Sequence, residues 1–142
     1  LSLAVWAIDW IFKPGRFVEA LTPFELQGEF ASAELERNTL ARDADVPSEL
    51  WGAYGQLNYH FMPDYLRDVL PSVFTEESTF TLVHRIDHVD IDSNRIERLS
   101  YGLNFRPIED TVFKFEYQFN LEDWSRRKVD NDTVALSVAT YF

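Results

Sequence analysis

The sequence predicts an all-β fold, namely an antiparallel up-and-down transmembrane β-barrel of which this chain forms the C-terminal strands. Apolar and polar residues alternate with a period of two along most of the 142 residues. Hydrophobic residues reach 46% of the composition although the mean hydropathy is only -0.24, so the two kinds are finely interleaved. The predicted loops alternate in length, and aromatic residues gather near strand ends, as they do in outer-membrane barrels.

The last ten residues carry the clearest pattern. Every second residue from 134 onward falls on one face of an extended strand: Val134, Leu136, Val138, Thr140 and Phe142. A closing barrel strand has such a lipid-facing row, with a terminal aromatic at the periplasmic edge of the bilayer. We therefore expect residues 133–142 to form a strand that runs down to the periplasm.

Alternation predicts about seven strands in one domain, residues 1–142. They cover residues 2–13, 24–34, 51–61, 79–90, 99–105, 113–119 and 133–142. Counting back from the last strand places the loops at 36–50, 91–97 and 121–132 outside and the turns at 13–23 and 106–111 in the periplasm. The 62–78 connection is longer than a usual periplasmic turn, and its prolines predict a short helix near 63–70.

The number of strands bears on where the chain starts. Bacterial single-chain barrels have an even number of strands, so seven indicates either the tail of a longer barrel or one strand missed. Leu1 lies inside an apolar pattern without a basic region or a cleavage site. We expect a processed or truncated start.

Aromatic side chains indicate which way the apolar rows face. Most lie near the turns placed in the periplasm, while Trp51, Tyr117, Phe119 and Trp124 mark the opposite end. The predicted lipid-interface aromatics are Trp10, Phe12, Tyr59, Phe61, Phe105, Phe113 and Phe142. The alternative is a soluble β-sandwich or lipocalin-like binding protein, which would bury the row from Leu99 to Phe105 in its core.

The polar rows of the strands carry full charges, which would line the pore of a barrel. The predicted pore-lining residues are Glu25, Glu29, Arg85, Asp87, Arg98, Arg106, Lys114 and Glu116. A turn centred near 109 places Lys114 opposite Asn104 and Glu116 opposite Gly102. We expect Arg85 to lie beside Gly102 and to reach Glu116, and these wall charges to bias the passage of ions.

The sequence gives no sign of catalysis. Cysteine is absent, no serine stands in a G-x-S-x-G motif, and His84 and His88 would lie roughly 13 Å apart on one strand, too far to share a metal. The net charge of -11 argues against nucleic acid as a partner. The prediction is a protein that is not an enzyme and has no cofactor.

Two charged loops allow a second interpretation. Asp90, Asp92 and Asn94 have the D-x-D-x-N spacing of a Ca²⁺ loop, but Arg95 and Tyr101 replace the glycine and glutamate that such a loop requires, so a solvated acidic loop is expected. The basic run at 126–128 either pairs with lipopolysaccharide phosphates or is a solvated charge run.

Four segments resemble the C-terminal part of bacterial outer-membrane porins, including the phosphate-selective type. They are AIDW at 7–10, FELQGEF at 24–30, YGLNFRP at 101–107 and VALSVATYF at 134–142. The resemblance departs at Thr140, where many porins have an aromatic residue.

The resemblance implies export to the outer membrane of a Gram-negative bacterium and a porin-type channel for passive diffusion of small polar or ionic solutes. It implies the lipid bilayer as a partner, leaves a homo-oligomer open and names no substrate. A structural barrel whose lumen is filled is the alternative within the same location.

Overall fold

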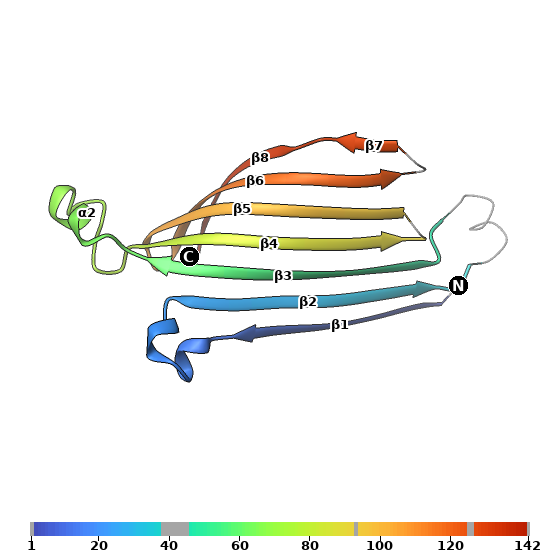
Figure 1. The fold of residues 1–142 in the computed structure, drawn as a ribbon, viewed down its shortest axis with the longest axis horizontal. Coiled ribbons are helices and arrows are strands. Elements are labelled where there is room, and N and C mark those ends of the chain that lie inside the picture. The colour runs from blue at the N-terminus through green and yellow to red at the C-terminus, as the bar shows by residue number, and fades with distance from the viewer. Residues whose placement is uncertain (1, 38–45, 93, 125–126, 142) are drawn as a thin grey trace.

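The protein is a single antiparallel sheet with short helices at one end (Figure 1). The computed structural model describes residues 2–37, 46–92, 94–124 and 127–141. The strands are β1 (Leu3–Phe12), β2 (Phe24–Leu35), β3 (Glu49–Phe61), β4 (Thr79–Ile91), β5 (Asn94–Ile108), β6 (Thr111–Trp124), β7 (Arg127–Asp130) and β8 (Thr133–Thr140). The 3-10 helices η1 (Pro14–Arg16) and η2 (Glu19–Leu21) and the α-helix α2 (Asp64–Val69) complete the fold.

Each strand from β1 to β6 pairs with the next one in the sequence. β7 and β8 share one edge of β6, where β7 pairs with residues 121–124 and β8 with residues 111–118. The sheet therefore has seven strand positions, which confirms the predicted up-and-down order. It is open, since β1 borders one edge and β7 and β8 border the other (Figure 1).

The register sorts the side chains onto two faces, because cross-strand partners point to the same side. One continuous row joins Tyr59, Leu82, Leu103, Phe115 and Leu136, and we call its side the apolar face. The row on the opposite side joins Gln27, Gln56, Arg85, Ser100 and Gln118, and we call that side the polar face.

Burial is inverted relative to a soluble domain. Among the described residues the only buried apolar side chains are Val83 and Val112, and both belong to the polar face. Large side chains of the apolar face are exposed instead, Ile86 by 64% and Leu136 by 78%. The described residues place no second sheet over either face, so the core that a β-sandwich needs is missing.

The connection between β3 and β4 contains the predicted short helix, which is α2. The connection is tied to β5 by Ser78, which is 1% exposed. Its hydroxyl donates to the carbonyl of Pro107 at 2.8 Å and accepts the backbone N–H of Thr75 at 2.8 Å.

The predicted loop at 121–132 is wrong. β6 continues to Trp124, and β7 returns along it. The register sets Lys128 opposite Asp123. The charged residues that indicated a loop therefore belong to paired strands.

A pair of glycines on the apolar face makes room for one aromatic ring. Gly28 and Gly55 are cross-strand partners. A Cβ at Gly28 would lie 2.7 Å from Cζ2 of Trp10 and 2.8 Å from the carbonyl oxygen of Tyr54, whereas a Cβ at Gly55 would meet no atom within 4 Å. The Trp10 indole therefore requires glycine at 28 but not at 55.

Replacing Gly28 by alanine is expected to lower the stability by about 1–3 kcal/mol, because overpacking displaces Trp10 or the β3 backbone. Gly55→Ala is the matched control and is expected to leave stability unchanged or slightly higher. Thermal unfolding in detergent, followed by tryptophan fluorescence, measures both variants. Equal loss in the two variants would contradict the close contact between Trp10 and Gly28.

Candidate functional site

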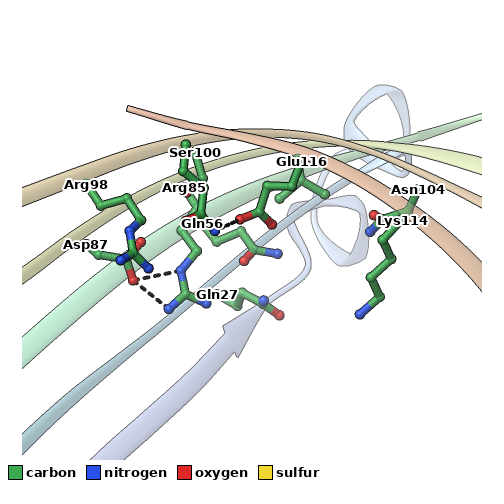
Figure 2. A pocket seen from close by; sticks show the side chains of 11 residues that line it. Gln27, Gln56, Arg85, Asp87, Arg98, Ser100, Asn104, Lys114 and Glu116 are labelled. Carbon is green, nitrogen blue, oxygen red and sulfur yellow. Dashed lines mark hydrogen bonds and ion pairs between the residues drawn. The ribbon is translucent and has the colours of Figure 1, made fainter. Parts of the chain in front are cut away.

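The polar face holds a hollow of about 440 Å³ that spans β2 to β6 (Figure 2). Its lining residues are Gln27, Gln56, Val83, Arg85, Asp87, Arg98, Ser100, Asn104, Lys114, Glu116 and Gln118. The structure thus brings together five of the eight residues predicted to line a pore. The other three, Glu25, Glu29 and Arg106, lie on the same face outside this hollow.

Arg85 is held by a carboxylate and an aromatic ring. Its Nε and Nη2 donate to Oδ1 of Asp87 at 2.8 and 2.5 Å (Figure 2), and its guanidinium carbon is 3.8 Å from the centre of the Tyr54 ring. A cation held in this way loses much of its freedom to move. Arg85 is therefore a fixed charge of the polar face.

The predicted contact from Arg85 to Glu116 is wrong, since these two described residues form no hydrogen bond or ion pair with each other. The β4–β5 turn pairs Ile91 with Asn94, which sets Arg85 opposite Ser100 and leaves Gly102 opposite Val83. The turn is tighter than the loop at 91–97 that the prediction assumed.

The predicted pairing of β5 with β6 is confirmed. Lys114 lies opposite Asn104 and Glu116 opposite Gly102, as a turn centred near 109 requires. The Glu116 carboxylate accepts a hydrogen bond from Nε2 of Gln118, its neighbour along β6 (Figure 2).

Among the residues that the structure describes, the guanidinium group of Arg98 is held by a hydrogen bond at Nε only. Its Nε donates to Oδ1 of Asn120 at 2.7 Å, and Asn120, which is 5% exposed, donates in turn to the carbonyl of Asn131 at 2.9 Å. Within the described chain, the side chains of Lys114 and Arg106 make no hydrogen bond or ion pair. Strands β5 and β6 thus present three cations that form no ion pair with another described residue.

Carboxylates occupy the other side of the polar face. Glu25 forms an ion pair with Nζ of Lys13 at 3.0 Å and accepts from Nδ2 of Asn58 at 3.3 Å. Glu29 lies directly opposite Asp9, and neither carboxylate has a partner among the described residues. The unpaired acids on β1 and β2 and the unpaired cations on β5 and β6 create an electric field along the sheet.

The predicted interface aromatics form a stacked row on the apolar face near the helices. The ring centres of Phe61 and Phe80 are 5.6 Å apart, those of Phe80 and Phe105 4.8 Å, and those of Phe105 and Phe113 6.4 Å. Tyr59 stacks on Phe61, whereas Phe12 on β1 stacks on Phe17, which is not part of the row. Trp10 lies away from this row, over Gly28 in mid-sheet, and Phe142 lies outside the described residues.

A second aromatic row crosses the apolar face nearer the opposite end of the strands. Trp6 stacks on Phe30 at 5.0 Å, Phe30 on Trp51 at 5.9 Å, and Trp51 on His88 at 4.8 Å. Of these four residues, the sequence analysis placed only Trp51 at this end of the strands. Trp6, Phe30 and His88 join the row through the strand register, which the sequence alone did not establish.

Charges begin beyond this second row. His88 contacts Glu97, with Nδ1 and Oε1 3.4 Å apart, and Asp90 pairs with Arg95 at 3.7 Å on the same face. The apolar face is therefore bounded by charged residues at this end.

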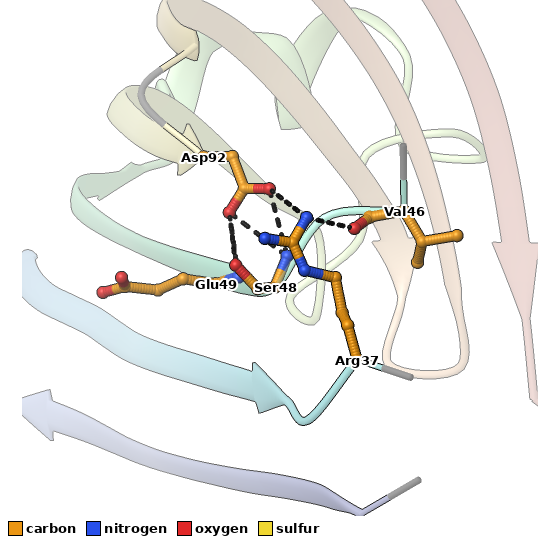
Figure 3. A network of polar contacts seen from close by, with 5 residues as sticks. All are labelled: Arg37, Val46, Ser48, Glu49 and Asp92. Atoms are coloured by element: carbon orange, nitrogen blue, oxygen red, sulfur yellow. Dashed lines mark hydrogen bonds and ion pairs between the residues drawn. The ribbon is translucent and has the colours of Figure 1, made fainter. Parts of the chain in front are cut away.

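The β4–β5 turn is tied to the start of β3 through Asp92 (Figure 3). Its carboxylate accepts the backbone N–H groups of Ser48 and Glu49, each at 3.0 Å, and the Ser48 hydroxyl at 3.2 Å. Arg37 lies 3.8 Å from the carboxylate and donates to the carbonyl of Val46 at 3.0 Å. The backbone N–H donors of Glu49 and Ser48 lower the pKa of Asp92 below its ordinary value.

This network involves Asp92, the second aspartate of the D-x-D-x-N spacing. The Asp92 oxygens are occupied by donors of the chain itself, and no group of three or more metal-binding side chains occurs among the described residues. The basic run at 126–128 lies partly outside them, so its pairing with lipopolysaccharide stays a prediction.

The chain matches no protein-family model, no curated protein and no solved structure. In the part of the chain that is described, the helices are all too short to cross a membrane.

The hydrogen bonds that the Asp92 carboxylate accepts are expected to persist at acidic pH. A carboxyl whose pKa is lowered in the folded state stabilises that state above its unfolded pKa, and this contribution disappears as the pH falls through the folded pKa. Amide chemical shifts of Ser48 and Glu49 should therefore change with a midpoint below about 3.9, the ordinary value for aspartate.

Asp92→Asn is the control for this titration, because asparagine also tolerates the positive φ of 46° at this position. The variant should abolish the acid transition at the two amides. A transition that persists in Asp92→Asn, or one with a midpoint above the ordinary value, would contradict the role of the carboxylate.

Proposed function

We propose that this sheet is part of the wall of an outer-membrane channel for passive diffusion of small polar or ionic solutes. The apolar face meets lipid and the polar face lines a water-filled pore. The observation that carries the proposal is the inverted burial, with an exposed apolar face bounded by two aromatic rows.

The apolar face needs a cover, and lipid is the one that fits. Exposed apolar surface costs about 25 cal/mol per Å² in water, and contiguous apolar patches of this extent are rare on soluble monomers. Ile8, Ile86 and Leu136 are each at least 60% exposed. Acyl chains would cover all of them without any second protein layer.

The two aromatic rows have the spacing of bilayer interfaces. They are eight residues apart on β4, from Phe80 to His88. At about 3.4 Å per residue this separation is roughly 27 Å along the strand, close to the apolar band of about 25 Å in outer-membrane barrels.

On β3 to β6 the first row follows one register line, which joins Phe61, Phe80, Phe105 and Phe113. Aromatic rings that line up across neighbouring strands are typical of the girdle at a membrane interface.

The open edges imply further strands in the complete wall. In lipid each unpaired backbone group costs several kcal/mol, so a spanning sheet must close. With seven strand positions in antiparallel order, β1 and β8 run in the same direction. An antiparallel barrel that includes them therefore needs an odd number of additional strands between the two edges.

The purified protein is expected to need detergent for solubility and to give stepwise conductance in KCl after reconstitution into planar lipid bilayers. Stable insertion without conductance would favour the alternative of a structural barrel with a filled lumen. A protein that is monodisperse without detergent would contradict the membrane location and favour a soluble binding protein.

The unpaired lysine of the hollow offers a test of the pore wall. Lys114→Glu is expected to shift the K⁺/Cl⁻ permeability ratio toward K⁺ by about twofold or more, since an exposed charge contributes up to about 1 kcal/mol. Lys114→Arg keeps the charge and should leave the ratio unchanged. An unchanged reversal potential in both variants would place Lys114 away from the ion path.

A further inference from the structure

One region of the polar face is lined by apolar residues. It lies on β1 to β4, near the end of the sheet where Asp92 lies. A hollow of about 280 Å³ occurs there. Its lining on the polar face is formed by Val5, Ala31, Ala33, Leu50, Gly52 and Val89. A wall that contacts only water and ions has no need of such a surface, so an apolar part of a solute is the fitting occupant.

Two carboxylates lie directly beside this hollow. Glu29 lies two residues before Ala31 on β2 and points to the same face. Its cross-strand partners are Asp9 on β1 and Tyr54 on β3. Like charges that face each other across two strands destabilise a sheet. A cation placed between Asp9 and Glu29 would relieve that repulsion.

The described cations of the polar face lie elsewhere. Lys13 is paired with Glu25, and Arg85 with Asp87. Arg98 and Lys114 are on β5 and β6, across the sheet from β1 and β2. None of these described cations complements Asp9 and Glu29, and a cationic solute would do so.

We propose that Asp9, Glu29 and the adjoining apolar hollow form a subsite for small organic cations, specifically primary ammonium ions that carry an apolar aliphatic or aromatic group. The ammonium group lies between the two carboxylates, and the apolar group fills the hollow. Glu29 and Ala31 are about 7 Å apart along β2, so one small molecule reaches both. This inference rests on the proposed channel and names a class of solute for it.

The test uses the full protein in planar bilayers, with benzylammonium as the probe and methylammonium as the same charge without the ring. Benzylammonium is expected to interrupt the KCl current, and methylammonium to do so far less. Asp9→Asn and Glu29→Gln should each weaken the interruption by about three- to tenfold.

Filling the hollow tests the apolar half of the subsite. Ala31→Leu and, as a second variant, Ala33→Leu should weaken the response to benzylammonium. A matched control comes from the far side of the same face: Ala135→Leu should leave the response unchanged.

The outcomes separate the two proposals. A protein that inserts without conducting KCl overturns the channel, and equilibrium dialysis of benzylammonium against the same protein and its variants then decides the subsite. Steady conductance without interruption overturns the subsite alone. Equal responses to benzylammonium, methylammonium and benzoate would also overturn it, because such binding requires neither the carboxylates nor the hollow.

Discussion

The antiparallel ladder is the constraint on which the whole structure depends. Because side chains alternate along each strand and cross-strand partners share a face, one register assigns every residue to one of two surfaces. A single sheet has no layer to cover either surface. The chemistry of the two faces therefore decides what surrounds the protein, and here the more apolar face is also the more exposed one.

Alternation and turn residues made much of this fold predictable. The strands β1 to β4 begin and end within two residues of the predicted ranges, and the helix after Pro63 forms where the prolines indicated. The hairpin at β6 and β7 was hidden because its charged residues lack the apolar alternation on which the prediction relied. The sequence alone could not establish the β4–β5 register, since a shift in one turn moves every partner that follows it.

The candidate site was predictable in composition but not in contacts. Which charges share the polar face follows from the period of two, and five of them do line one hollow. The partner of each charge depends on rotamers and neighbours instead. Arg85 pairs with Asp87 two residues along its own strand, and the ring of Tyr54 lies beneath it. The apolar hollow beside Asp9 and Glu29 was missed because it combines four strands whose alignment is set by the ladder.

Asn58, Val83, Ser100 and Asn120 are buried on the polar face, and Val83 and Ser100 line its hollow. Asn58 bonds to Gln56 and Glu25, and Asn120 to Arg98, which are side chains of the same face. In the proposed channel, exchanging a thick bilayer for a thin one, or lipid for a micelle, would disturb the outward rings and aliphatic chains first. The geometry that a passing solute meets would thereby be insulated from the composition of the membrane.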